Sequence, residues 1–378
     1  MRPSLRIRRG EALTVTLSGL TGDETALLQK IFFMSDRPDR PGFEVPKPGV
    51  FSVHGSASQL RHCLPRLIGH TQVPGRIASL FRSQLDNVLR PDYKIEAGGR
   101  VLDLGSRTHI MGILNVTPDS FSDGGQYAGH DAAMAHARTL AADGADIIDI
   151  GGESTRPGAL PLSEDEELQR VIPVIERIAS EIPVPVSIDT YKARVARKAL
   201  AAGASIVNDI SGLRFSPDMA PIAADHGAVV VLMHIKGTPR DMQADPVYGD
   251  VVGEIMDYLD ESAAIALKAG IGRDRILVDP GIGFGKTMQH NLEIISRLDE
   301  LMALGFPIVM GTSRKRFIGT VLDIAEPRAR VEGTAATVAL SIERGAHVVR
   351  VHDVGYMKKV AKMTDAIVKA KHREPGAE

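Results

Sequence analysis

The stretch HIMGILNVTPDSFSDGG (109–125) begins a regular alternation of apolar runs and amphipathic segments that decides the fold. The later apolar runs are DIIDIGG (146–152), PVSIDT (185–190), SIVNDISG (205–212), AVVVLMH (228–234), RILVDPG (275–281), PIVMGTS (307–313) and HVVRVHD (347–353). Helical periodicity marks the segments 131–142, 164–180, 191–202, 250–269, 290–304, 334–344 and 354–371. Nearly continuous apolar strands fit a parallel sheet that is covered on both faces. Eight strand–helix units predict an α/β fold of the (β/α)8 TIM-barrel class.

The first hundred residues predict a separate small α/β module. Strands are expected at 13–19 and 50–56, and helices at 23–34, 57–68 and 75–89. The Pro- and Gly-rich stretch 35–49 cannot be regular over its whole length. A short hairpin is expected at VLDLGSRTH (101–109). The predicted organisation is a module of unknown role at 1–100, a catalytic barrel at 101–372 and a tail at 373–378.

Composition narrows the class of protein. The net charge of −2 gives no broad basic field that would attract nucleic acid or a membrane. A single cysteine, Cys63, excludes an intrachain disulfide framework. The basic N-terminus lacks the apolar core of a signal peptide, and no apolar run approaches the ~18 residues of a membrane span. We therefore expect a soluble cytoplasmic protein without nucleic-acid or membrane partners.

Polar side chains follow every predicted strand of the barrel. In this fold class the active site lies at the C-terminal ends of the strands. The residues there are Asn115, Glu153, Asp189, Asn208, Asp209, His234, Asp279, Ser313, Lys315, Arg350 and His352. Any one of the Asp, Asn or Ser residues could instead cap a helix. Convergence of eight strand ends on one face favours a binding site.

The strand-end residues have two chemical characters. Asp189, Asn208 and Asp279 suit a flat heterocycle rich in hydrogen-bond donors, such as an aminopyrimidinone. The second group is cationic and suits an anion such as phosphate; it contains Arg156, Lys315, Arg350 and His352. Arg350 and His352 are two residues apart and should point the same way on a strand. The alternative is that His352 packs against the barrel rim and Arg350 pairs with an inward carboxylate such as Asp279.

The segment SRKR (313–316) places three cations at an expected helix start. This arrangement opposes the helix dipole and favours a bound anion. The alternative is that Arg314 and Arg316 point into solvent.

Two familiar motifs are excluded. DPGIGFGKT (279–287) has only three residues between Gly281 and Gly285, so it is not a P-loop. The twelve histidines show no zinc-ligand spacing. A Mg2+ held partly by a diphosphate, with Asn115 as its one protein ligand, fits the sequence better than a permanent metal centre.

Several motifs together resemble those of the dihydropteroate synthase family. They are MGILNVTPDSFSDGG (111–125), GGESTRPG (151–158), SIDTYK (187–192), NDISG (208–212), DPGIGFGKT (279–287), GTSRKRFIG (311–319) and VRVHD (349–353). They occur in the family's order, and the resemblance covers about 105–372. It implies condensation of 6-hydroxymethyl-7,8-dihydropterin diphosphate with 4-aminobenzoate in folate biosynthesis, Mg2+ as cofactor, sensitivity to sulfonamides and a homodimer. Residues 1–100 resemble the N-terminal extensions of some members.

The resemblance also assigns roles to residues. The pterin-binding set would be Asp189, Asn208, Met233, Asp279, Lys315 and Arg350. The diphosphate would be held by Asn115, Thr155, Arg350 and His352, with Asn115 also a Mg2+ ligand. The 4-aminobenzoate pocket would be formed by Phe121, Pro157, Phe284 and Lys315. The catalytic residues would be Asp123, Arg156 and Lys315. Arg316 stands where some members have a serine near the aminobenzoate carboxylate, and its role stays open.

Two other functions compete with the synthase. A pterin-dependent methyltransferase barrel shares the pterin-side Asp and Asn residues but has no use for a diphosphate site. A pterin-binding protein without activity would be expected to lack Asn115, Asp123 or the pair of Arg350 and His352, all of which are present.

Overall fold

The computed structural model describes residues 4–9, 13–33, 41–56, 59–60, 73–89, 93–116, 125–154 and 161–371. Contacts divide the chain into two compact units. The first comprises Met1–Pro91 with Arg297–Gly305, and the second comprises Asp92–Ser296 with Phe306–Glu378. None of the described helices combines the length and the apolar content that a membrane span requires.

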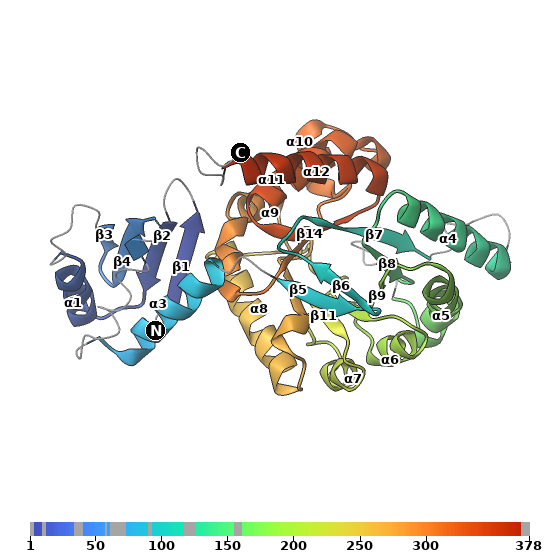
Figure 1. Cartoon of the computed structure of the whole chain (residues 1–378), viewed down its shortest axis with the longest axis horizontal. Coiled ribbons are helices and arrows are strands. Elements are labelled where there is room, and N and C mark those ends of the chain that lie inside the picture. Colours follow the sequence, from blue (N-terminus) through green and yellow to red (C-terminus); the bar gives the residue numbers. More distant parts are fainter. Residues whose placement is uncertain are drawn as a thin grey trace. The chain divides into compact units, whose positions relative to one another are not determined.

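The second unit is a closed barrel of parallel strands wrapped by helices (Figure 1), which confirms the predicted fold class. Its strands are β7 (His109–Asn115), β8 (Ile147–Gly151), β9 (Val186–Asp189), β10 (Ile206–Asp209), β11 (Val229–Met233), β12 (Ile276–Asp279), β13 (Ile308–Met310) and β14 (Ala346–Val351). Neighbouring strands pair in chain order, and β14 pairs with β7 to close the ring. Each predicted strand is found within about three residues of its expected bounds.

Helices follow the strands in the expected alternation. They are α4 (Gly125–Ala142), α5 (Glu164–Glu181), α6 (Ala193–Ala201), α7 (Met219–Asp225), α8 (Val251–Lys268), α9 (Met288–Ser296), α10 (Arg316–Leu322), α11 (Val331–Glu343) and α12 (Val354–Lys371). The expected helix at 290–304 is instead α9 followed by the 3-10 segment η3 (Leu298–Leu304). The short helix α7 was not singled out from the sequence, because its seven residues include Pro221 and span only two turns.

A hairpin of β5 (Lys94–Ala97) and β6 (Arg100–Asp103) closes the N-terminal end of the barrel. Its apolar side chains share one core cluster with the inward-facing strand residues Met111, Ile147, Ile206, Val229, Val231, Leu277, Val309 and Val348. Gly98 and Gly99 form the turn with φ of 56° and 71°, a backbone that glycine adopts without strain. The hairpin expected at 101–109 was therefore placed too late, and residues 93–103 belong to the same unit as the barrel.

The first unit is a small α/β module built on an antiparallel sheet in the order β1 (Ser4–Arg9), β2 (Leu13–Ser18), β4 (Val50–Gly55) and β3 (Gly42–Lys47). Helices α1 (Gly22–Phe33) and α3 (Gly75–Val88) belong to the same unit. The rings of Phe32 and Phe51 pack in its core, with their centroids 5.5 Å apart and their planes tilted by 43°. The expected strands and two of the three expected helices are present; the third, at 57–68, falls mainly outside the described residues. Strand β3 lies within the Pro-rich stretch, where an edge position tolerates Pro46.

Candidate active site

The C-terminal ends of β7, β8 and β9 place two predicted site residues beside each other. Asn115, Gly151 and Asp189 occupy matching positions on these adjacent strands. A Cβ built on Gly151 would lie 3.7 Å from Asn115 Oδ1 and 3.8 Å from Asp189 Oδ2. The glycine therefore leaves room between an amide and a carboxylate that face the same space.

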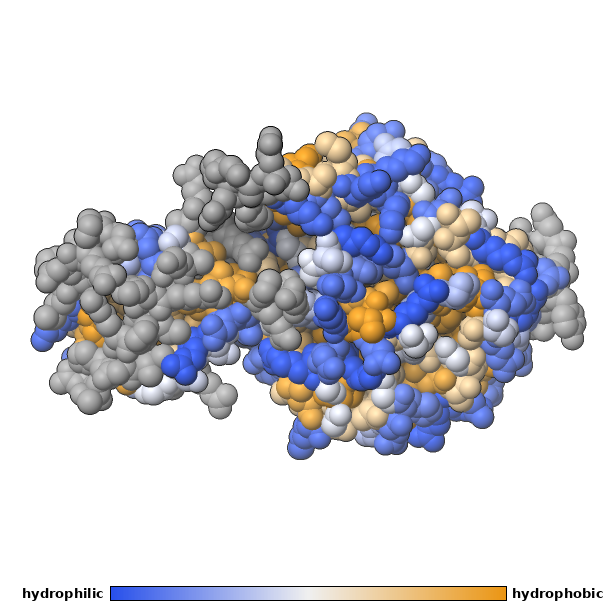
Figure 2. Space-filling view, viewed as in Figure 1, coloured by the Kyte–Doolittle hydropathy of each residue, from blue (hydrophilic) through white to orange (hydrophobic). Residues whose placement is uncertain are grey.

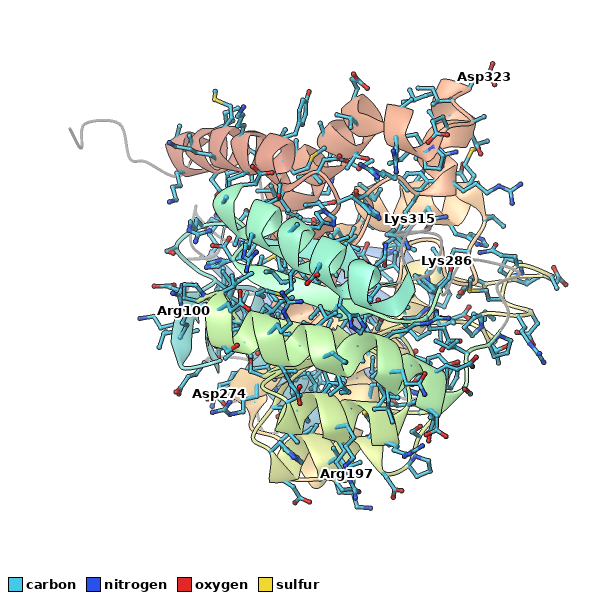
Figure 3. The ribbon with its side chains drawn as sticks, turned by 90° about the vertical axis from the view of Figure 1, so that its right-hand side faces the viewer. Arg100, Arg197, Asp274, Lys286, Lys315 and Asp323 are labelled. Atoms are coloured by element: carbon cyan, nitrogen blue, oxygen red, sulfur yellow. The ribbon has the colours of Figure 1, made fainter. Side chains whose placement is uncertain are left out.

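The remaining strand ends complete a ring of polar side chains. Asn208 is paired in register with Asp189, and Met233 is paired with Asp279. A Cβ on Gly311, just after β13, would lie 3.9 Å from Asp279 Oδ2 and 4.0 Å from Arg350 Cβ. In Figure 3, Lys286 and Lys315 lie at the end of the barrel opposite Arg100 of the hairpin. The structure thus brings Asn115, Asp189, Asn208, Asp279 and Arg350 together at one mouth, whereas Asp209 accepts hydrogen bonds from Ser211 and Leu213 in its own turn.

Arg350 is held by two carboxylates inside this mouth. Its Nε donates to Asp149 Oδ2 at 2.6 Å and its Nη2 donates to Asp189 Oδ2 at 2.7 Å. Burial alone would lower the pKa of Arg350, but the two carboxylates raise it above its ordinary value. Pairing with an inward carboxylate was the alternative considered from the sequence, although the partners are Asp149 and Asp189 instead of Asp279. Nη1 makes no hydrogen bond within the described part of the chain and can still donate to a ligand.

Asp149 is a site residue that sequence reasoning missed. It is fully buried in the middle of β8, and its Oδ2 also accepts a hydrogen bond from Asn208 Nδ2 at 3.1 Å. Its other oxygen, Oδ1, has no hydrogen-bond partner among the described residues. The available signal was a carboxylate inside the otherwise apolar run IIDIG, since an unpaired charge is rarely buried in a strand.

Asp279 and Asp189 have raised pKa values. Asp279 is 5% exposed, and its Oδ1 accepts the backbone N–H of Gly281 at 2.7 Å. Burial raises the pKa of Asp279 above its usual range, against the opposing effect of that hydrogen bond and of Lys315 and Arg350. Burial also raises the pKa of Asp189, with Arg350 opposing and Asp149 adding to the shift. Burial thus disfavours the charged form of both carboxyl groups, and a ligand that donates hydrogen bonds to them would stabilise that form.

Lys315 and Phe284 lie together beside the polar ring. The ammonium of Lys315 is 4.3 Å from the centroid of the Phe284 ring, a distance typical of a cation–π contact. Phe284 packs against the apolar cluster that contains Met233. These contacts give the mouth an apolar wall next to its hydrogen-bonding groups.

Hydrogen bonds join the residues that follow β14 to the SRKR segment. His352 Nδ1 lies 2.9 Å from Ser313 Oγ, so the ring orientation is fixed. Arg314 pairs with Asp353, with an Nε–Oδ2 distance of 3.0 Å, and does not point into solvent. Arg316 is exposed, so the solvent alternative applies to that residue.

A buried lysine–histidine pair supports the loop after β12. Lys286 Nζ lies 2.8 Å from His234 Nδ1 and donates to the Phe284 carbonyl at 2.9 Å. Burial lowers the pKa of Lys286 well below its ordinary value, and burial with Lys286 nearby lowers the pKa of His234 to about 2. Sequence reasoning assigned no role to Lys286, which fixes the backbone around Phe284.

The five loop residues predicted for the site, Phe121, Asp123, Thr155, Arg156 and Pro157, lie outside the described residues. Within the described ranges, no group of three His, Cys, Asp or Glu side chains could hold a metal ion. Asn115 makes no side-chain hydrogen bond in the same ranges, so its amide oxygen can serve a ligand that brings most of its own oxygens.

Comparison with known proteins identifies the class. Residues 111–352 match the pterin-binding enzyme family. The dihydropteroate synthase of Bacillus subtilis is 52% identical over 267 residues, which cover 71% of this chain and 91% of that protein. The solved Xanthomonas albilineans dihydropteroate synthase with 4-aminobenzoic acid has a TM-score of 0.69 and 45% identity, covering 73% of this chain and 98% of that one. The Yersinia pestis enzyme with a sulfonamide drug has the same TM-score and 42% identity, covering 73% and 99%.

The chain belongs to the pterin-binding enzyme family. Within that family it is a dihydropteroate synthase, a transferase of folate biosynthesis. The similarity supports this activity over the methyltransferase alternative. The match to the family extends over the barrel, whereas the N-terminal module lies outside the matched region.

Proposed function

We propose that the mouth of the barrel joins 6-hydroxymethyl-7,8-dihydropterin diphosphate to 4-aminobenzoate and releases pyrophosphate. The observation that carries the proposal is the ring of Asp189, Asn208 and Asp279 around the guanidinium of Arg350. The carboxylates and amide match the donors of an aminopyrimidinone edge, and the guanidinium matches an anion and a flat ring.

The pterin ring would be recognised by hydrogen bonds and by stacking. Asp279 would accept the 2-amino and N3 hydrogens, because burial leaves it few competing donors. Asp189 and Asn208 would bond the remaining ring atoms, and Lys315 would face the carbonyl side. Met233 and Arg350 would lie against the two faces of the ring.

The diphosphate would lie between Arg350, His352 and Asn115, with Thr155 as a further donor. Asn115 is the one protein oxygen we assign to Mg2+, which fits an ion held mainly by the diphosphate and water. When bound, Mg2+ would supply charge stabilisation to the leaving group. Arg350 and His352 are fixed in advance by Asp149, Asp189 and Ser313, so little reorganisation accompanies the charge that develops on pyrophosphate.

The second substrate would occupy the apolar wall next to the pterin. Phe284 and the stem of Lys315 form that wall among the described residues, and Phe121 and Pro157 would complete it. Departure of pyrophosphate leaves a cation delocalised into the pterin, which Asp123 would stabilise. The neutral arylamine then attacks the methylene carbon. This nucleophile needs positioning more than deprotonation, so Lys315 and Arg156 would orient it.

Binding is expected to be ordered, with the pterin diphosphate first. The 4-aminobenzoate pocket includes residues of two loops, and the diphosphate would order these loops before the second substrate binds. Calorimetry should therefore show 4-aminobenzoate and sulfonamides binding only in the presence of pyrophosphate or pterin diphosphate. Tight binding of 4-aminobenzoate to the empty enzyme would contradict the order.

We also expect a homodimer that acts in the cytoplasm. Helix α12 presents Tyr356, Met363 and Ile367 at 50%, 62% and 59% exposure, and α10 and α11 add Val321, Leu322 and Leu340. Hydrophobic residues reach the surface in the region of α10–α12, at the top of Figure 2. Such an exposed apolar face favours a protein partner. Light scattering should give twice the monomer mass, and Met363→Glu combined with Ile367→Glu should give the monomer; a monomeric wild type would exclude this interface.

A further inference from the structure

One buried ammonium holds three acceptors beside β8 and α5. Lys192 Nζ donates to Glu153 Oε2 at 2.6 Å, to Glu167 Oε2 at 2.6 Å and to the Leu162 carbonyl at 2.7 Å. The other oxygen of Glu153 accepts from Tyr191 Oη at 3.1 Å and from the Leu162 N–H at 3.3 Å. All three ammonium hydrogens are used, as are both oxygens of Glu153.

This Lys192 cluster is desolvated. The side chains of Lys192, Glu153 and Glu167 are 11%, 10% and 1% exposed. Burial alone would lower the pKa of Lys192, but its hydrogen bonds to both glutamates raise it, so the lysine stays charged. Burial raises the pKa of Glu167 and that of Tyr191, the latter to about 12. Removing one member of such a buried group leaves the others uncompensated.

The cluster connects two points that flank one loop. Glu153 follows β8, and Leu162 immediately precedes the start of α5, where Ser163 and Glu166 form a capping box. Between them lie Thr155, Arg156 and Pro157. Lys192 contacts the segment on both sides and is itself placed by the start of α6. Glu153 and Leu162 are thereby joined through one ammonium.

We infer that Lys192 is a positioning residue of the synthase, which fixes the two ends of the loop that carries Thr155, Arg156 and Pro157. The inference rests on the proposed role of that loop at the diphosphate and at 4-aminobenzoate. Both oxygens of Glu153 accept hydrogen bonds within the Lys192 cluster, which places Glu153 in that cluster. The pterin ring pocket is built from other strands, so the ring should bind without the Lys192 contacts.

The test is Lys192→Met, which keeps the length of the side chain and removes its charge. A misplaced loop should lower kcat/KM for 4-aminobenzoate by about 100-fold. Affinity for 6-hydroxymethylpterin, which has no diphosphate, should change by less than about threefold. Amide hydrogen exchange in the 154–163 peptide should accelerate. Lys192→Arg should be about tenfold more active than Lys192→Met, because a guanidinium can still bond both glutamates.

Arg194→Met is the matched control. Arg194 also joins α6 to the start of α5, at 2.6 Å from Asp165, but it is half-exposed and does not contact Glu153 or Leu162. Its loss should leave both kinetic constants unchanged, as for an exposed ion pair. If Lys192→Met does not fold, Glu153→Gln replaces it, since the amide keeps the shape and removes the charge that Lys192 Nζ contacts.

The outcomes separate the two proposals. Suppose that the wild type is active and that Lys192→Met, or Glu153→Gln in its place, keeps kcat/KM for 4-aminobenzoate within threefold of the wild-type value. This result would overturn the inference and leave the proposed reaction standing. Equal losses of bare pterin binding and of turnover would show a general structural role and would also overturn it. A wild type that releases no pyrophosphate in response to 4-aminobenzoate would instead overturn the proposed function.

Discussion

Replacing Arg350 by methionine should lower kcat/KM by about 1,000-fold or more, the largest effect we expect at this site. The guanidinium would contact both the pterin face and the diphosphate, so affinities for bare pterin and for pyrophosphate should both fall. Stability should fall as well, by about 3–5 kcal/mol, because Asp149 and Asp189 would be left as unpaired carboxylates in the barrel. Isothermal calorimetry measures the affinities for pterin and for pyrophosphate, and urea unfolding measures the stability.

Two comparison variants make the result specific. His352→Ala should lower the affinity for pyrophosphate and leave the affinity for the bare pterin unchanged, because His352 lies beyond β14 and beside Ser313. Arg107→Met breaks an ion pair of 2.6 Å with Asp146 at the opposite end of the barrel and should leave substrate affinity unchanged. If His352→Ala lowers the affinity for the bare pterin as much as the affinity for pyrophosphate, then the proposed division of roles between Arg350 and His352 is wrong.

Replacing Asp279 by asparagine should abolish most pterin binding and should not lower stability at neutral pH. The substitution puts a donor where the pterin presents donors, at a cost of about 1–3 kcal/mol or more, and kcat/KM should fall by about 100-fold. The fold tolerates the change because asparagine Oδ1 can still accept the Gly281 N–H. Calorimetry with 6-hydroxymethylpterin tests the first expectation, and unchanged affinity would remove Asp279 from the pterin site.

The pH dependence of stability tests the second expectation. Folding raises the pKa of Asp279, so the folded state binds this proton more tightly than the unfolded state does. The Asp279 carboxyl therefore destabilises the folded state least below its unfolded-state pKa, where it is protonated. This destabilisation is complete once the pH has risen through its folded-state pKa, where the carboxyl is charged. Above that pH the Asp279→Asn variant should be at least as stable as the wild type, and below pH ~4 the two should converge. A variant that is less stable at neutral pH and more stable in acid would reverse the assigned sign.

The sequence was enough to locate the mouth of the barrel, because strand ends in a parallel barrel meet on one face. Asp189, Asn208, Asp279 and Arg350 were found this way. Asp149 was missed because it lies inside a strand, one layer below the strand ends. The bonds of Lys192 and Lys286 were beyond reach for another reason: both join residues 25 or more positions apart, and a linear pattern does not show such contacts.

Local signals decided which parts of the fold could be predicted. The barrel strands stand out because buried parallel strands are almost uninterrupted apolar runs. In the N-terminal module neither β1 nor β3 was predicted. Strand β1 lies in the basic N-terminal segment, and β3 lies in the Pro- and Gly-rich stretch that was expected to be irregular. The β5–β6 hairpin was misplaced because its turn signal, Gly98 and Gly99, was assigned to the end of the module and not to a hairpin turn.

The most direct measurement is pyrophosphate release from 6-hydroxymethyl-7,8-dihydropterin diphosphate, with and without 4-aminobenzoate, in the presence of Mg2+. We expect release at a rate that rises with 4-aminobenzoate and saturates, with one 7,8-dihydropteroate formed for each pyrophosphate. Release that does not depend on 4-aminobenzoate, or no release when both substrates are present, would contradict the proposed reaction.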